Sequence, residues 1–224
     1  MNGGGGVNRM AKQFGLILFL AVGVAVATNA QGRRRAPASL APKVTAAQIA
    51  AGKSYGVKEA PIRIDEYSDF ECPHCQALYL NTLRPLIEDY VSSGKVYLVH
   101  HDFPLPMHNY ARQAAYYADA AAAVGRFAQV EQALFLHQAQ WAATGKIEPV
   151  VAAALDPGKM KEVEALAQTA EVREAVQADV TQGQQLGIDE TPTMFITYRG
   201  KRTPIVGVVS YQILRGYLTA LLHQ

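Results

Sequence analysis

Alternation of apolar and polar residues predicts a strand after Pro61. Along residues 62–67 the side chains alternate, so that one face is apolar apart from the carboxylate of Glu66. Residues 95–102 are rich in Val and Tyr and stop before Pro104, a pattern that favours a second strand. The first half of the chain is therefore expected to supply two strands.

A helix is expected between these strands, from Pro73 to about Gly94. Proline is favourable in the first turn of a helix, whereas Pro85 lies inside this one and should kink it. One face is marked by apolar residues at spacings of three and four: Cys75, Tyr79, Leu83, Leu86 and Tyr90. A shorter helix over 46–51, capped by Thr45, should precede the first strand.

The pattern turns helical from about His108 to Leu186 and then returns to strands. Several helices are expected there, one of them rich in alanine and one starting at Asp156-Pro157. The segments expected after them are a strand at 193–198, a turn at 199–201, a strand at 204–208 and a helix capped by Ser210. This order predicts an α/β sheet interrupted by a helical insertion of about 80 residues.

Composition and charge exclude several classes of protein. Of the 224 residues, 50% are hydrophobic and 18% charged, which is typical of a globular chain. The net charge is only +2 and no long basic run occurs, so nucleic acid binding is not expected. The two cysteines, Cys72 and Cys75, are too few for a framework of several disulfides or for a four-cysteine zinc site.

Residues 1–30 have the pattern of a secretory signal peptide. Arg9 and Lys12 precede an almost wholly apolar run from Phe14 to Ala27, and small residues follow. An uncleaved membrane anchor and a buried core helix are the alternatives. Residues 31–43 are interpreted as a flexible basic linker. Export would deliver the protein to an oxidising compartment outside the cytoplasm, such as the periplasm, where disulfides persist.

The sequence Cys72-Pro73-His74-Cys75 lies where the first strand gives way to the helix. On a first helical turn both sulfurs lie on one side, close enough for a somewhat strained disulfide. The helix start and a positively charged His74 would both stabilise the Cys72 thiolate and make the pair reactive. An inert structural disulfide, or a copper or zinc site formed by these cysteines with histidines, remains an alternative.

Three stretches resemble the DsbA-like thiol:disulfide oxidoreductases of the thioredoxin-4-like branch. They are residues 66–75 (EYSDFECPHC), residues 187–193 (GIDETPT) and residues 102–105 (DFPL). The resemblance covers roughly Tyr55 to the C-terminus and implies a thioredoxin fold with an inserted helical domain. The domains expected are a signal peptide (1–30), a linker with a short helix (31–54), a first thioredoxin-fold segment (55–105), a helical insertion (106–187) and a second thioredoxin-fold segment (188–224).

The same resemblance implies roles for individual residues. Cys72 would be the exposed nucleophile, Cys75 its buried partner and His74 the residue that tunes Cys72, with Pro73 between them. The peptide bond Thr191-Pro192 would be cis and face the disulfide, where the Thr191 backbone binds substrate as an added strand. Glu66 would be a buried acid that takes the Cys75 proton.

These residues predict an exported enzyme that introduces disulfides into secreted polypeptides, without a cofactor or a bound metal. Partners implied by the resemblance are unfolded or reduced polypeptides and a membrane quinone-linked reoxidant of the DsbB or VKOR kind; a monomer is expected. Glu71 would oppose the thiolate if its side chain pointed inward. In the family that the chain resembles, the strongest oxidases often carry Val before the cis-proline, whereas Thr, as at position 191, is also common in the isomerase and thioredoxin-4-like branches. Disulfide isomerase or reductase is therefore the alternative.

The other histidines carry weaker expectations. His100 and His101 should face opposite sides of their strand, so they cannot share one metal ion. His137 lies on an apolar helix face and is interpreted as a core residue, and His108 is expected to start a helix. Tyr117 and its neighbours Tyr110 and Tyr116 are expected in the core.

Overall fold

A five-stranded mixed sheet lies at the centre of the folded part of the chain. The computed structural model describes Met1 and residues 44–224, so the predicted signal peptide and linker lie outside the described residues. The strand order is β1-β3-β2-β4-β5; β2 and β3 are parallel, and the other neighbours are antiparallel. The strands are β1 (Ser54–Tyr55), β2 (Ile62–Ser68), β3 (Val96–Asp102), β4 (Thr193–Tyr198) and β5 (Lys201–Val206).

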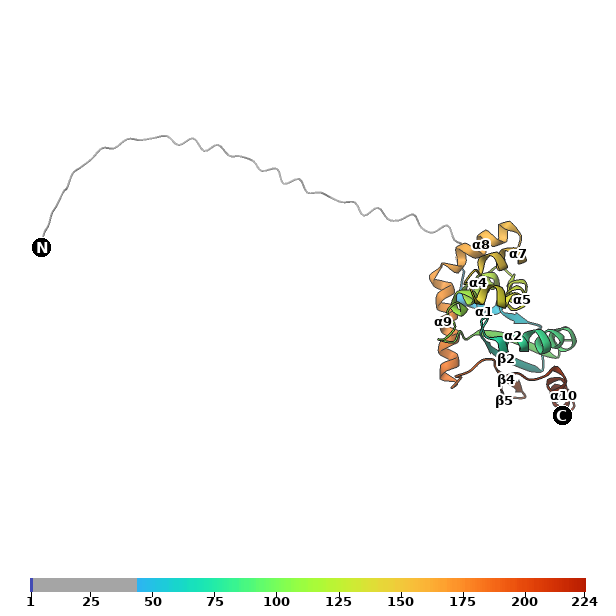
Figure 1. The fold of residues 1–224 in the computed structure, drawn as a ribbon. Coiled ribbons are helices and arrows are strands. Elements are labelled where there is room, and N and C mark those ends of the chain that lie inside the picture. The colour runs from blue at the N-terminus through green and yellow to red at the C-terminus, as the bar shows by residue number, and fades with distance from the viewer. Residues whose placement is uncertain (2–43) are drawn as a thin grey trace, which may run out of the picture. The chain divides into compact units, whose positions relative to one another are not determined.

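Helices surround this sheet, and most of them belong to the segment between β3 and β4. Figure 1 shows α4, α5, α7 and α8 at one end of the folded unit and β4, β5 and α10 at the other. The helices are α1 (Ala46–Gly52), α2 (Pro73–Leu78), α3 (Arg84–Leu86), α4 (Ala111–Ala123), α5 (Phe127–Leu136), α6 (Gln138–Ala142), α7 (Glu148–Ala154), α8 (Pro157–Ala167), α9 (Ala170–Gln185) and α10 (Tyr211–Leu222). The predicted α/β fold with a helical insertion is confirmed.

The helix after β2 contains two π-helical segments. These segments, η1 (Tyr79–Leu83) and η2 (Ile87–Val91), lie on either side of α3, which contains Pro85. Proline lacks the N–H that an α-helix would use, and widened turns are one way for a helix to accommodate such a gap. The five residues predicted to form its apolar face are all buried.

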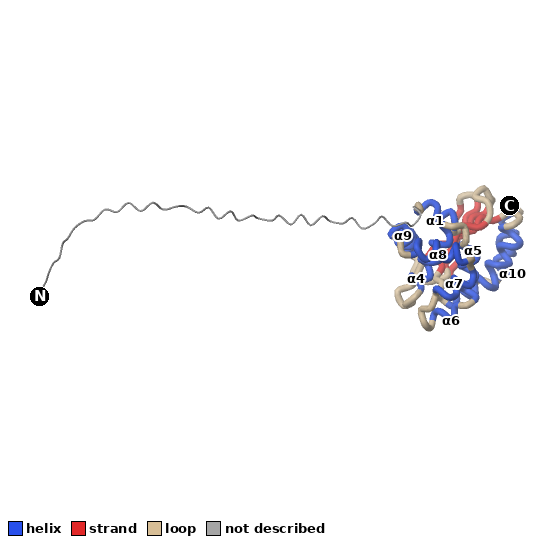
Figure 2. The backbone as a smooth tube through the Cα atoms, turned by 90° about the horizontal axis from the view of Figure 1, so that it is seen from above, coloured by secondary structure: helices blue, strands red, loops and turns tan. Residues whose placement is uncertain are grey.

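The two faces of the sheet pack against different helices. On one face, α9 approaches so closely that a Cβ at Gly183 would lie 2.6 Å from the ring of Phe103. The Tyr67 hydroxyl donates a hydrogen bond to Gln182 on the same side. The opposite face carries Glu66 and packs against α5 and the helix that begins at Pro73, while α10 packs along that helix on its other side. Figure 2 shows α10 separated from the insertion helices.

Several local predictions agree with the structure and others need correction. Thr45, Asp156 and Ser210 each cap a helix as predicted, through a side-chain oxygen that accepts a backbone N–H. β1 was not predicted, and β5 starts three residues earlier than expected. The prediction for His137 is wrong: the chain breaks between α5 and α6 there, and the side chain is exposed rather than in the core.

None of the helices within residues 44–224 is both long and apolar enough to cross a membrane. This finding concerns only that part of the chain.

A single buried lysine connects the insertion to the rest of the fold. Lys53 follows α1 and is 3% exposed, with Nζ 2.5 Å from Asp102, 2.8 Å from Asp119 and 2.6 Å from Asp179. Burial opposes its charge, but the three carboxylates outweigh burial and raise the pKa of Lys53 well above its ordinary value. Burial and the nearby Asp102 raise the pKa of Asp119.

Replacing this lysine should therefore destabilise the protein strongly. Lys53→Met removes the positive charge and leaves the carboxylates buried without it, which should lower the free energy of unfolding by about 3–5 kcal/mol. Urea unfolding measures the change, with Lys146→Met as a control at an exposed lysine. A loss no larger than that of the control would contradict a stabilising role for the ion cluster.

Candidate active site

Cys72 lies at the junction between β2 and α2, immediately before the first helical turn. Its backbone is extended, with φ −76° and ψ 122°, and Pro73 occupies the first helical position. A helix start leaves backbone N–H groups without partners in the helix. Both cysteines are free, and the thiol of Cys75 lies in the same first turn. The local sequence therefore brings the sulfur of Cys72 to an unpaired helix end.

The two thiols differ in acidity. Hydrogen bonds to the Cys72 sulfur, first from the Cys75 thiol and then from the backbone N–H groups of Cys75 and His74, lower the pKa of Cys72 to about 5 against the effect of burial. Burial raises the pKa of Cys75 well above its ordinary value, and the negative charges of Cys72 and Glu66 act in the same direction. At neutral pH the pair holds one negative charge, on Cys72.

Cys72 is less exposed than the sequence predicted. It is 5% exposed and Cys75 is 0% exposed, so both count as buried, although Cys72 is the more accessible. The reason is the loop before β4: the carbonyl oxygen of Thr191 lies 3.5 Å from the Cys72 sulfur and covers it. The Thr191 hydroxyl is buried without a hydrogen-bond partner within residues 44–224, and it contributes to the low pKa of Cys72.

The peptide bond between Thr191 and Pro192 is cis, as predicted. Its position next to the cysteines follows from the sheet, because β4 begins at Thr193 and pairs with β2 along Tyr67↔Thr193. The loops that precede β4 and follow β2 therefore meet at one edge of the sheet. This brings together two segments that are about 120 residues apart in the sequence.

Two charged residues beside the cysteines have defined positions. The carboxylate of Glu71 accepts a hydrogen bond from the backbone N–H of Tyr110 at 2.7 Å, so it is bound to the segment before α4. Its carboxylate is therefore held by the backbone of Tyr110, and Glu71 is not among the groups that contribute most to the pKa of Cys72. The imidazole of His74 is exposed, and the contribution of His74 to the Cys72 sulfur comes through its backbone N–H.

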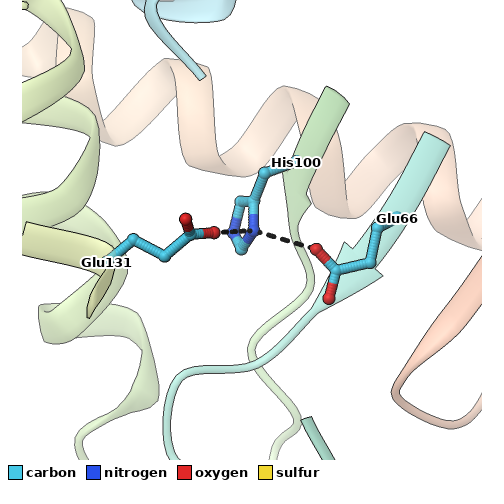
Figure 3. A group of neighbouring side chains, drawn as sticks. All are labelled: Glu66, His100 and Glu131. Atoms are coloured by element: carbon cyan, nitrogen blue, oxygen red, sulfur yellow. Dashed lines mark ion pairs between the residues drawn. The ribbon is translucent and has the colours of Figure 1, made fainter. Parts of the chain in front are cut away.

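Glu66 is buried and belongs to a cluster with His100 and Glu131 (Figure 3). Nδ1 of His100 lies 3.2 Å from Glu66 and 3.3 Å from Glu131, and Nε2 lies 3.5 Å from Asp102. Burial opposes a charge on His100, but these carboxylates raise the pKa of His100 well above its ordinary value. The surrounding carboxylates therefore favour the imidazolium form of His100, while burial raises the pKa of Glu131.

The sequence analysis missed Glu131, which comes from α5 and accepts a hydrogen bond from the Tyr55 hydroxyl. The sequence offered a signal only for the proximity of Glu66 and His100. Glu66 and His100 are register partners on neighbouring parallel strands, so their side chains lie on the same face. Within residues 44–224, these three side chains are the one group that brings three ligand atoms within 4.8 Å of one another, and the group includes neither cysteine.

His101 faces the opposite side of the sheet from His100, as predicted. Its Nε2 lies 2.9 Å from Asp65 and its Nδ1 lies 3.1 Å from Asp179 of α9. Tyr117 is buried, in agreement with its predicted place in the core.

The prediction for His108 is wrong, because α4 begins only at Ala111. His108 lies in the preceding loop, where its Nδ1 is 2.7 Å from the carboxylate of Asp69. Asp69 lies in the loop between β2 and Cys72 and is 1% exposed. No periodicity or motif in the sequence connects these two residues, so their pairing could not be anticipated.

Comparisons with known proteins agree with this geometry. A family model described as "Thioredoxin" (Thioredoxin_4) matches residues 49–204. DsbA2 of Pseudomonas aeruginosa has 26% identity and a TM-score of 0.57, and the match covers 76% of this chain and 93% of that one. The α-DsbA1 protein of Wolbachia pipientis has 20% identity and a TM-score of 0.64, over 75% of this chain and 89% of that one.

Two curated relatives extend the comparison. "Na(+)/H(+) antiporter NhaA 3" of Salinispora tropica is 30% identical over 171 residues, which are 75% of this chain and 25% of that protein. "Probable disulfide bond formation protein D" of Bacillus anthracis is 24% identical over 149 residues, 64% of this chain and 69% of that protein. The chain spans about a quarter of the length of the antiporter relative.

The fold and the cysteine pair at a helix start define a thioredoxin-fold redox protein. The chain belongs to the thioredoxin family matched above, in the branch of the DsbA-like thiol:disulfide oxidoreductases. The resemblance of the three sequence stretches is thereby confirmed.

The difference between the two thiols should be visible by alkylation. Iodoacetamide should modify one sulfur of the reduced protein, Cys72, with an apparent pKa of about 5, because only its thiolate is stabilised. Mass spectrometry of digests across a pH series locates and times the reaction. Cys75→Ser isolates the response of Cys72, and Cys72→Ser that of Cys75. Equal labelling of both sulfurs would contradict the assignment.

Proposed function

We propose that this protein is an exported thiol:disulfide oxidoreductase that introduces disulfides into unfolded secreted polypeptides through Cys72 and Cys75. The observation that carries the proposal is the low pKa of Cys72, about 5, beside a Cys75 thiol that stays protonated. A stabilised thiolate favours the reduced form of the enzyme and is a good leaving group, so the oxidised form is a strong oxidant. The names of the Bacillus relatives agree with this direction.

The reaction proceeds by two exchanges. A substrate thiolate attacks the sulfur of Cys72, the bond between Cys72 and Cys75 breaks, and a mixed disulfide between substrate and Cys72 forms. A second substrate thiolate then attacks the substrate sulfur of the mixed disulfide. Cys72 leaves as a thiolate, and the substrate leaves with a new disulfide. The acidity of Cys72 favours this last step, because a thiol of low pKa leaves faster.

Cys75 must gain a proton after the first exchange, because burial disfavours its thiolate. Glu66 is our proposed carrier of this proton, linked to the imidazolium of His100. When the enzyme is reoxidised, the same carboxylate would take the proton back. The influence of the Glu66 charge on the pKa of Cys75 supports this role.

Substrate would bind along the loop before β4. The Thr191 backbone faces the Cys72 sulfur at 3.5 Å, so a chain that docks there as an added strand brings its own cysteine to the reactive sulfur. The remaining elements of the proposal are export by the 1–30 signal, work as a monomer, the domain boundaries of the sequence analysis and reoxidation by a membrane quinone-linked partner of the DsbB or VKOR kind. They rest on sequence resemblance.

The redox equilibrium with glutathione tests the direction of the reaction. An oxidase should have a potential near that of DsbA, about −120 mV, whereas a value near that of thioredoxin, about −270 mV, would assign a reductase instead. His74→Ser tests the tuning role proposed for the imidazole and should shift the equilibrium toward the oxidised form. If His74→Ser left the reduction potential unchanged, the His74 imidazole would have no tuning role.

The reduced protein should also be more stable than the oxidised protein at neutral pH. A disulfide across the four residues of Cys72-Pro73-His74-Cys75 constrains the unfolded chain by only about 2 kcal/mol. Opposing it, a folded pKa of about 5 against about 8.5 in the unfolded chain stabilises the reduced form by about 3 kcal/mol at pH 7.

The sign of this difference should depend on pH. Because the folded pKa of Cys72 is depressed, the stabilisation is complete above the unfolded pKa and is lost as the pH falls through about 5. Urea unfolding should therefore show that the reduced form is the more stable one at about pH 7 and that the oxidised form is the more stable one below about pH 5. A higher midpoint for the oxidised form at both values would indicate a weakly oxidising centre.

A further inference from the structure

The carboxylate of Asp69 holds the imidazole of His108 in a fixed orientation. Asp69 is buried and accepts hydrogen bonds from the backbone N–H groups of Glu71 and Leu105, and from Nδ1 of His108, each at 2.7 Å. A carboxylate can only accept, so Nδ1 carries a hydrogen. In the neutral imidazole the lone pair therefore lies on Nε2.

The same residue is tied to both cysteines through its backbone. The N–H of Asp69 donates to the sulfur of Cys75 at 3.4 Å, and its carbonyl accepts the N–H of Cys72 at 3.1 Å. His108 is thus attached to the residue that organises the cysteine loop. His108 therefore lies against the loop that leads into Cys72, and the negative charge of Cys72 is one of the influences that raise the pKa of His108.

Nε2 of His108 is available to an incoming molecule. It forms no hydrogen bond within residues 44–224, and 21% of the His108 side chain is exposed. A histidine whose only role is to hold the loop in place through Asp69 needs neither a free Nε2 nor an exposed side chain. An oriented imidazole with a free nitrogen, next to the reactive sulfur, is the arrangement of a general base.

We propose that Asp69 and His108 form a general-base pair that acts on the cysteine thiol of a polypeptide substrate. This inference rests on the proposed function and deepens it. A substrate thiol has a pKa of about 8.5, so only about 3% of it is thiolate at pH 7. A base beside Cys72 raises that fraction where the attack takes place.

Proton transfer and sulfur attack balance in atoms and electrons. Nε2 of His108 takes the proton from the substrate thiol, and the sulfur electron pair forms a bond to Cys72. The bond between Cys72 and Cys75 breaks, and its electron pair goes to Cys75. The substrate sulfur and Cys72 are now joined by a disulfide, and His108 is an imidazolium held by Asp69. The proton leaves to water after the product departs.

The charges around His108 fit both halves of the cycle. Burial opposes its positive form, but Asp69, Glu71 and the Cys72 thiolate raise the pKa of His108 above its ordinary value in the reduced protein. These negative charges favour the protonated form of His108 while Cys72 is a thiolate. In the oxidised protein the charge of Cys72 is gone, so the imidazole gives up its proton more readily and can serve as a base.

The pH dependence of substrate oxidation tests this role. His108→Asn keeps an amide N–H near the position of Nδ1, and so the bond to Asp69, but has no basic nitrogen. Oxidised wild-type and variant proteins are mixed with a reduced dithiol peptide, and the rate is followed by stopped flow. His137→Asn serves as the control, because that histidine is exposed and lies outside the cysteine loop.

We expect His108→Asn to slow the reaction about tenfold at pH 7, within a ceiling of about 30-fold set by the thiolate fraction. The deficit should shrink below about twofold near pH 9.5, where the substrate is already ionised. In His108→Ala, added imidazole should restore part of the rate at pH 7. If His108→Asn slowed the reaction equally at both pH values, the role of His108 would be structural, and this would overturn the proposal.

Two further outcomes separate this inference from the function on which it rests. If the wild type oxidises the peptide and His108→Asn matches it at every pH, only the role of His108 fails. If the oxidised wild type does not oxidise the peptide at all, the proposed function fails and the inference fails with it.

Discussion

The first turn of α2 leaves backbone N–H groups without partners in the helix, and the sulfur of Cys72 lies at this helix start, where the N–H groups of Cys75 and His74 lower its pKa. Most features of the site follow from this arrangement. The sulfur can receive these N–H groups only because β2 ends at Ser68 and the following loop turns the chain into the helix. Burial, together with the negative charge on Cys72, raises the pKa of Cys75. Two side chains of the same type therefore differ in acidity because of where the fold places them.

Charged side chains are buried on both faces of the sheet. Consecutive histidines of β3 point to opposite sides, and each finds carboxylates there: His100 meets Glu66 and Glu131, and His101 meets Asp65 and Asp179. Isolated charges at these depths would be costly, and pairing is what makes them tolerable. The two groups are connected through Asp102, Lys53 and Asp179, and Glu66 is the member whose charge acts on the Cys75 thiol.

Residues with a local pattern could be predicted from the sequence, and residues brought together by tertiary contacts could not. The alternation along 62–67 identified β2 and the buried Glu66, and the sequence from Cys72 to Cys75 identified the helix start. Glu131 and the pairing of Asp69 with His108 depend on loops and helices that meet only in the folded chain. The low exposure of Cys72 has the same origin, since the segment at Thr191 covers it from far along the sequence.

The buried lysine after α1 bears on whether the helical insertion is a separate module. Two of its three carboxylate partners, Asp119 and Asp179, come from the insertion, and Lys53 itself comes from outside it. If the insertion were removed or moved onto another thioredoxin scaffold, Asp119 and Asp179 would lose Lys53, and Lys53 would lose two of its three carboxylate partners. The insertion and the remainder of the fold are thus electrostatically interdependent, and an engineer who wished to exchange the insertion would have to redesign position 53 with it.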